Sequence, residues 1–233
     1  MKMNKKNILL VSLLVCAVAI LSLGTLAWFN ATADVTNTFK VSTSDAVDGT
    51  PDFSVEVWEN ENDGDDALDA DGDGNTETTT TGNTYEHIAP GDVIAKNPTV
   101  ENTGDYDQYI RVYVTFSDYA EIEQAYTDHS ETLDLRTWLN VDSTVWEADD
   151  TLTSTDTAAD TITYGYYLND ALDVDATAEL FSTVTIPYWF VQEDMSYGTD
   201  GFSVNVLAQA IQAANTGADA QTAFTNWLPE YDA

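Results

Sequence analysis

The sequence is poor in the side chains that most enzymes use for catalysis. Among 233 residues it has one cysteine, Cys16, and two histidines, His87 and His129. It has no HExxH metal-binding motif and no Gly-x-Ser-x-Gly nucleophile elbow. Among its many carboxylates, nothing singles out a pair for glycoside hydrolysis. These absences argue against catalysis, and we expect that the protein is not an enzyme.

Basic residues are also scarce. The chain has 7 lysines and arginines against 41 aspartates and glutamates, for a formal net charge of -34. Three of the seven basic residues are lysines within residues 1–6. A surface this acidic repels nucleic acid and anionic lipid headgroups and needs cations to offset its self-repulsion. We therefore expect no nucleic-acid partner and an exterior that contains salt or calcium.

The N-terminal segment has the layout of a secretory signal peptide. Lysines precede an apolar run over residues 8–23, which is followed by small residues ending at Ala27. This layout predicts export, cleavage by a signal peptidase between Ala27 and Trp28, and a secreted product in the extracellular matrix or at the cell surface. An uncleaved anchor is the alternative, because the run approaches the roughly 20 residues of a membrane helix. The protein would then meet the membrane only through this segment, whereas cleavage removes the only cysteine and with it any disulfide.

The remaining residues 28–233 have the composition of one folded domain. The chain is 43% hydrophobic and 11% aromatic, which is too apolar for a disordered protein. Alternation of apolar and polar residues, interrupted only at Asn37, predicts strands at residues 29–41, 53–57 and 110–116. In the first of these, the apolar residues at odd positions are Phe29, Ala31, Ala33, Val35, Phe39 and Val41.

Weaker patterns predict further strands and two short helices. The strands are expected at residues 95–101, 161–168, 182–190 and 202–212, with Pro187 marking an edge or an interruption. One helix would begin at an Asp118 cap and run through Tyr126, and the other would follow Gly217. Residues 60–84 and 143–160 are predicted to be surface loops. The expected fold is all-β: an antiparallel, jelly-roll-like β-sandwich with one or two short helices, preceded by a signal-peptide helix over residues 1–27.

Several short motifs are spread over most of the chain. Residues 24–30 combine small residues, alanine and an aromatic pair. The central motifs are Pro90-Gly91-Asp92 with Lys96, Val100-x-Asn102-x-Gly104 and Tyr109-x-Arg111-Val112, followed by Leu180-Phe181 and residues 208–213. Together these segments resemble the TasA/camelysin family of exported proteins, whose signal peptides are processed by a dedicated signal peptidase.

The resemblance implies a function as well as a fold. It implies a jelly-roll-like sandwich that assembles with copies of itself into surface fibres or biofilm matrix by passing an N-terminal strand from one subunit to the next. Residues 28–41 are the candidate donor strand. Alternation alone does not separate pairing with a neighbour's sheet from pairing within the same subunit, so both interpretations stay open. Because part of the camelysin branch is described as proteolytic, the resemblance also raises a peptidase as a lesser alternative.

The motif residues also have physical interpretations of their own. Pro90 and Gly91 predict a tight turn that an Asp92 side chain can close. Residues 102–104 predict a hairpin turn into the following strand. Arg111, which lies mid-strand among many carboxylates, is expected to form a structural ion pair rather than to act in catalysis.

An acidic segment within residues 60–84 suggests a calcium site. Asp69, Asp71 and Asp73 alternate before Gly74, an arrangement that wraps oxygen ligands around calcium. The twelfth position, however, is Thr80 rather than a bidentate acid, so an acidic solvated loop is the alternative. Calcium is the only cofactor that the sequence suggests. A monomeric, calcium-dependent binding module of the adhesin type is the second expected function.

Overall fold

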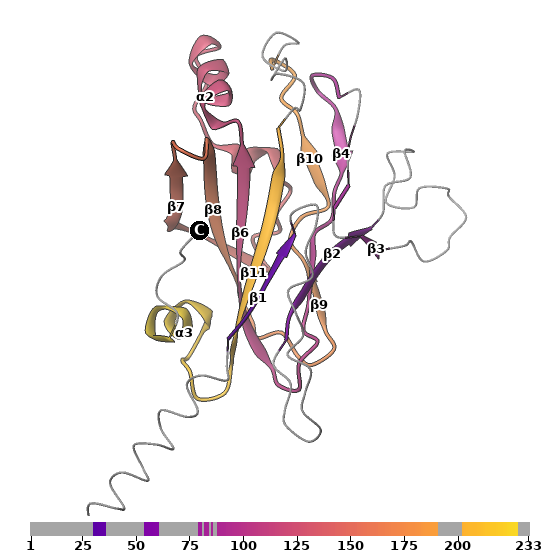
Figure 1. Ribbon diagram of the computed structural model, residues 1–233, viewed down its shortest axis with the longest axis vertical. Helices are drawn as coiled ribbons and strands as arrows, with labels where there is room; N and C mark the ends of the chain where they lie inside the picture. The colour runs from indigo at the N-terminus through magenta and orange to yellow at the C-terminus, as the bar shows by residue number, and fades with distance from the viewer. Residues whose placement is uncertain are drawn as a thin grey trace, which may run out of the picture.

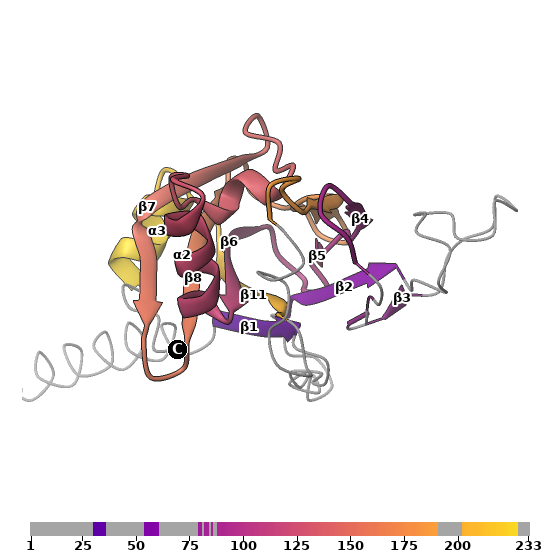
Figure 2. The same cartoon turned by 90° about the horizontal axis from the view of Figure 1, so that it is seen from above.

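Two antiparallel layers form the protein. The computed structural model describes residues 30–35, 54–60, 79–80, 82–83, 85, 88–190 and 202–227. One sheet has the order β1 (Asn30–Val35), β11 (Val204–Gln212), β6 (Gln108–Ser117), β8 (Thr161–Leu168) and β7 (Trp146–Asp156). The other layer contains β3 (Thr79–Thr80), β2 (Glu56–Asn60), β5 (Thr99–Glu101) and β9 (Thr177–Glu179), together with the pair β10 (Thr183–Thr185) and β4 (Val93–Ala95). Figure 2 shows the two layers from above.

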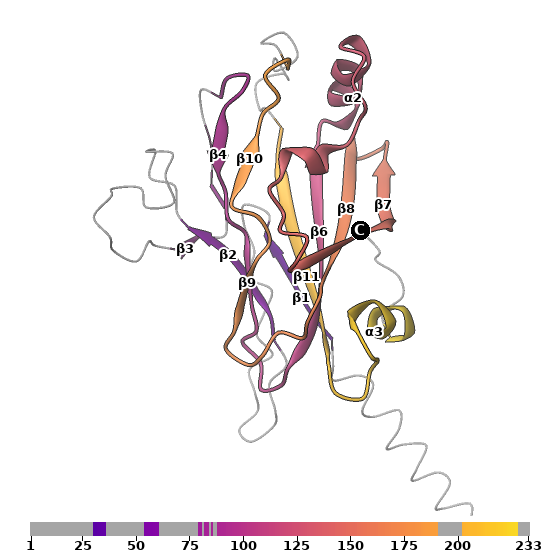
Figure 3. The same ribbon diagram turned by 180° about the vertical axis from the view of Figure 1, so that it is seen from behind.

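Two short α-helices pack against the five-stranded sheet. Helix α2 (Tyr119–Asp128) follows β6 at one end, and α3 (Ala220–Trp227) follows β11 near the other end (Figures 1 and 3). A 3-10 helix, η1 (Leu135–Trp138), lies between α2 and β7. The all-β antiparallel sandwich with two short α-helices is therefore confirmed. The jelly-roll path of the chain stays a prediction, and the expected signal-peptide helix lies outside the described residues.

The core lies between the two layers because alternate residues of the central strands point into it. On β6 these residues are fully buried: Ile110, Val112, Val114 and Phe116. Trp138 of η1 closes one end of the core, where its ring meets the Phe116 and Phe190 rings edge to face. A smaller cluster on the outer face of the sheet joins Ile211 and Phe224 and seats α3. The middle of the sheet is consequently buried on both faces.

Most predicted strands are present, with boundaries set by proline. Residues 161–168 are β8 over their full length. Residues 95–101 divide into β4 and β5, with Pro98 between them. The strand predicted at residues 182–190 ends at Thr185, before Pro187. Since proline has no N–H to donate to a neighbouring strand, both interruptions have the same cause.

The loop predicted at residues 143–160 is wrong for most of its length. Residues Trp146–Asp156 form β7, which pairs with β8 at the edge of the sheet. Only Trp146 is buried in this strand. An edge strand with two solvated faces needs no apolar alternation, so its composition is that of a loop. Its pairing shifts register between Asp149 and Ser154, where a bulge bends the strand.

The two motif turns have different outcomes. At residues 89–92 the Ala89 N–H donates to Asp92 Oδ2 at 2.7 Å, and Gly91 takes a φ of 89°. This confirms the tight turn closed by Asp92. Residues 102–104, by contrast, connect β5 of one layer to β6 of the other, so the predicted hairpin turn is wrong. In the described part of the chain, no helix is both long and apolar enough to cross a membrane.

Candidate functional site

The first candidate site is the sheet edge that holds β1. This strand pairs antiparallel with β11, from Asn30 opposite Ile211 to Val35 opposite Val206 (Figure 1). Thus part of the predicted donor segment occupies the slot beside β11 of its own chain. The rest of that segment, including Phe29, Phe39 and Val41, lies outside the described residues, as do Ala27 and Trp28 of the predicted cleavage site.

The register places the predicted apolar positions on one side of the sheet. Ala31, Ala33 and Val35 lie opposite Ala210, Ala208 and Val206 of β11. These three β11 residues are at most 1% exposed and belong to the core between the layers. Along the slot, the core-facing residues of β11 are therefore two alanines and a valine.

The opposite edge of the same sheet is built differently. Along β7, the residues from Glu147 to Asp156 are exposed or half-buried. Asp149 accepts hydrogen bonds from the Thr151 side chain and backbone, and these bonds lower the pKa of its carboxyl although partial burial opposes them. Charge and a bulge both hinder pairing with another strand. The two edges therefore differ: β11 accepts a strand, and β7 resists one.

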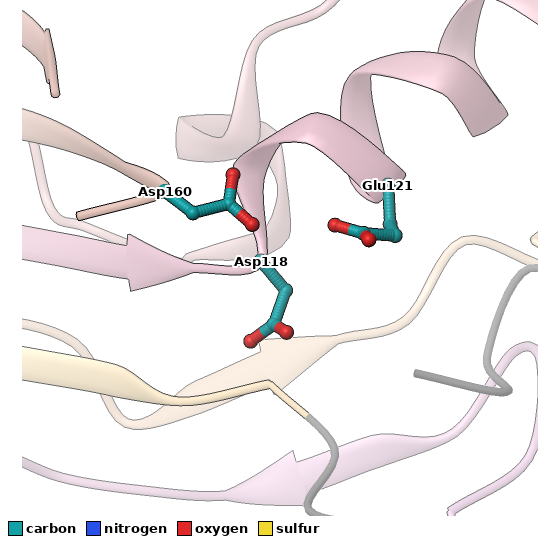
Figure 4. A group of neighbouring side chains, drawn as sticks. All are labelled: Asp118, Glu121 and Asp160. Carbon is teal, nitrogen blue, oxygen red and sulfur yellow. The ribbon is translucent and has the colours of Figure 1, made fainter. Parts of the chain in front are cut away.

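The second candidate site is an acidic cluster at the start of α2. The carboxylates of Asp118, Glu121 and Asp160 lie within 4.8 Å of one another, and Figure 4 shows them around the first turn of the helix. Asp118 and Glu121 come from the β6–α2 junction, whereas Asp160 comes from the turn between β7 and β8. The sequence did not predict this cluster, because Asp118 and Asp160 are 42 residues apart and Asp160 lies in the segment that was predicted to be a loop.

Asp118 lies at the predicted N-cap position of α2, but its side chain does not cap the helix. Asp118 occupies the N-cap position with a φ of 57°, but its side chain makes no cap hydrogen bond. Asp160 supplies the cap instead: its Oδ1 accepts from the Ala120 N–H at 2.9 Å, and its carbonyl accepts from the Tyr119 N–H. The helix begins where it was predicted to begin because an aspartate from another hairpin satisfies its free N–H groups.

The three carboxylates have the chemistry to hold a hard cation such as calcium, which takes oxygen ligands. Asp118 and Asp160 are half-buried, but Glu121 is exposed, and exposed acidic groups are common without a metal. The positive end of the helix dipole also lies here and disfavours a cation. The calcium site predicted at Asp69, Asp71 and Asp73 lies outside the described residues and stays a prediction.

Two cations of the family-like motifs are buried for structural reasons. Lys96 Nζ lies 2.9 Å from Oε2 of Glu59, whose side chain is fully buried. Arg111 is 1% exposed, donates from Nε and Nη2 to Gln209 Oε1, and lies 4.4 Å above the Phe224 ring. Hence Lys96 joins strands of one layer, and Arg111 holds α3 against the other layer.

Asn102 is the third buried motif residue. Its Nδ2 donates to the carbonyls of Tyr106 and Leu172, both at 2.9 Å, and to that of Asp173 at 3.1 Å. Its Oδ1 accepts from the Gly104 N–H. One side chain therefore ties the crossing between the layers to the segment before β9. Sequence reasoning placed this residue in a turn but gave no sign of its distant partners.

Of the two histidines, the structure describes His129. The His129 ring tilts over Trp189 at a centroid distance of 5.2 Å at the end of α2, and His87 lies outside the described residues. No protein-family model matches the chain, and no curated protein or solved structure matches it either. The resemblance to the TasA/camelysin family therefore rests on the motifs alone and stays a prediction.

Proposed function

We propose that this protein is a secreted structural subunit of cell-surface fibres or biofilm matrix, and that β1 of one copy fills the slot beside β11 of the next. The observation that carries the proposal is the antiparallel pairing of β1 with β11 at a sheet edge. Export and cleavage after Ala27 belong to the proposal, because cleavage would leave β1 close to a free chain end. A strand near a free end can leave its slot and enter another without threading the chain.

Exchange of β1 costs little locally because the same contacts form in both arrangements. A strand from a second copy would meet the same β11 backbone groups in the same register. The slot is also lined by Ala208 and Ala210, and a buried methyl group contributes only about 0.8 kcal/mol. Main-chain hydrogen bonds therefore supply most of the pairing energy, as in other cases of strand addition.

The difference between the two edges supports an assembly with a defined direction. Of the two edges of the five-stranded sheet, the β11 side is the one that suits a donated strand, because β7 presents carboxylates and a bulge. Each copy then offers one strand and one slot. Such a head-to-tail contact produces a filament when the rotation between successive copies does not close into a ring.

Disulfide trapping tests whether the β1 strand beside β11 comes from the same chain or from a neighbouring copy. Ala33 and Ala208 are directly opposite in the register, so the variant Ala33→Cys, Ala208→Cys places two thiols across the slot. If β1 is donated, oxidation of the fibres gives a covalent ladder of subunits on a non-reducing gel. The matched control is Val112→Cys, Ala208→Cys, which joins β6 to β11 within one chain and should give monomers only.

Two results would overturn the proposal. Fibres that contain only internally bridged monomers would show that β1 stays in its own sheet. Electron microscopy of the exported protein, with and without calcium, supplies the second test. Single particles under all conditions, together with a calcium-dependent rise in melting temperature, would favour the monomeric binding module instead.

A further inference from the structure

The direction of β1 decides where the chain leaves the slot beside β11. The first residue of the strand, Asn30, lies opposite Ile211 near the end of β11, and its last residue, Val35, lies opposite Val206 near the start of β11. β11 starts beside the end of β6 that leads into α2. A chain that follows β1 therefore leaves the slot toward the end of the molecule that carries α2, which we call the α2 end (Figure 1).

The chain re-enters the described fold at the opposite end of the sandwich. Ser54 is the next described residue after Val35. Its carbonyl accepts a hydrogen bond from Gln108 Nε2 at 2.9 Å, and its Oγ accepts one from Thr103 Oγ1 at 2.8 Å. Gln108 is the first residue of β6, and Thr103 lies in the connection between β5 and β6. We call this the β5–β6 end.

A donated strand therefore orients two copies relative to each other. In the acceptor, the strand leaves the slot at the α2 end, and in the donor the same chain enters the fold at the β5–β6 end. The shortest connection places the β5–β6 end of the donor over the α2 end of the acceptor. Residues 36–53 span at most roughly 60 Å when fully extended, which limits how far apart these two ends can lie.

Exposed apolar side chains lie at both of these ends. At the α2 end, Val93 at the start of β4 is 57% exposed, and Tyr188, which lies against the turn at Gly91, is 83% exposed. At the β5–β6 end, Tyr106 and Val174 are 38% and 40% exposed and line one groove. Removal of such surfaces from water is favourable, so an end-to-end contact would stabilise the pair of copies.

We propose that the β5–β6 end of each copy packs on the α2 end of the next, with Tyr106 and Val174 of the donor against Val93 and Tyr188 of the acceptor. The inference rests on the proposed strand donation and adds a second contact between the same two copies. The strand tethers the two ends, so they meet at the high effective concentration of linked groups. Even a small apolar contact is then sufficient to order the stack.

Carboxylates at both ends oppose this contact at low ionic strength. Asp92 is exposed at the α2 end, and Asp107 and Asp173 are exposed at the β5–β6 end. Salt shortens the range of their repulsion from about 10 Å at 0.1 M to about 3 Å at 1 M. The contact should therefore strengthen as the salt concentration rises.

Chains with a single cysteine test which ends meet. Cleavage after Ala27 removes Cys16, so an added thiol is the only one in the exported chain. Val174→Cys marks the β5–β6 end, and Tyr188→Cys marks the α2 end. Fibres formed from the two chains together are treated with a short bismaleimide and separated on a denaturing gel. The mixture should give cross-linked dimers, with a higher yield at about 1 M salt than at about 0.1 M, and fibres of either chain alone should give none.

Thr153→Cys supplies the matched control. Thr153 is exposed in β7, along the side of the molecule, so this variant mixed with either end variant should give no dimers. Dimers in fibres of one end variant alone would show that like ends meet, and dimers of equal yield with Thr153→Cys would show unspecific contacts. Either result overturns the inference.

The disulfide ladder through Ala33 and Ala208 separates this inference from the proposed function. A ladder without dimers in the mixture of Val174→Cys and Tyr188→Cys overturns the end contact and leaves strand donation intact. Internally bridged monomers overturn strand donation and this inference with it. A ladder together with dimers confined to the mixture supports both.

Discussion

Two tyrosines of β8 bury their hydroxyl groups in different ways. Tyr164 is 4% exposed, and its oxygen accepts a hydrogen bond from the Leu135 N–H at 3.2 Å. Tyr166 is 2% exposed, and in the described part of the chain its hydroxyl has no hydrogen-bond partner. Burial raises the pKa of both hydroxyls above the ordinary tyrosine value. The pair therefore offers a matched test of what a buried, unpaired polar group costs.

Removal of the hydroxyl should change stability in opposite directions at the two positions. A buried unpaired group costs about 1–3 kcal/mol, so Tyr166→Phe should raise the free energy of unfolding by roughly 1 kcal/mol. Tyr164→Phe leaves the buried Leu135 N–H without an acceptor and should lower it by about 1–2 kcal/mol. Both variants keep the ring, so the core volume scarcely changes.

Urea unfolding followed by tryptophan fluorescence measures the difference. The midpoints should separate while the slope with denaturant stays constant, because neither change alters the surface exposed on unfolding. If Tyr166→Phe is destabilised as much as Tyr164→Phe, the Tyr166 hydroxyl has a partner such as a buried water, and the reasoning fails.

Three further predictions concern the buried ion pair, the bulged edge and the half-buried carboxylate of Asp134. Lys96→Met should lower the free energy of unfolding by about 3–5 kcal/mol because it leaves a buried charge on Glu59, and adding Glu59→Gln should recover much of the loss in the same urea assay. Gly165→Ala should lower the free energy of unfolding by about 1–3 kcal/mol because the new Cβ would lie 2.4 Å from Leu152 Cβ. Adding Leu152→Ala should relieve this clash. A double variant that is no more stable than Gly165→Ala alone would contradict the explanation. The Arg136 guanidinium donates a hydrogen bond that lowers the pKa of the Asp134 carboxyl. The stability that this bond contributes is therefore present above the unfolded pKa of about 3.9 and is lost as pH falls through the folded pKa. Asp134→Asn should therefore lower the melting temperature at pH 7 but not near pH 2.

The sequence predicts two kinds of element correctly: strands with one buried face, and turns whose hydrogen bonds involve only neighbouring residues. On β6, alternate residues such as Val112 and Val114 fill the core, and the alternation is visible in the sequence. The turn at residues 89–92 needs only residues within the turn. The edge strand β7 was missed because solvent covers both of its faces, and no periodic signal marks such a strand.

The features of the candidate site that were missed depend on residues far apart in the sequence. Asp160 caps α2 from 40 residues away, and Asn102 reaches the Leu172 carbonyl across 70 residues. The sequence does not mark Asp160 or the Leu172 carbonyl as a hydrogen-bond partner, because any carboxylate or carbonyl at the same position in space could accept the bond. A motif shows that a side chain has a role, but the fold decides which groups it contacts.

The same reasoning explains why the alternation of residues 29–41 predicts which residues share a face of the strand but not whether the strand pairs within its own subunit or with a neighbour. Positions 31, 33 and 35 lie opposite Ala210, Ala208 and Val206 of β11. The acceptor strand, rather than the donor, therefore decides which strands fit, and it is the same for a strand of its own chain and for one from a neighbour. A substitution at positions 31 or 33 would therefore meet the same neighbours in both arrangements. It should affect the folding of the subunit and its assembly together, because both use one slot.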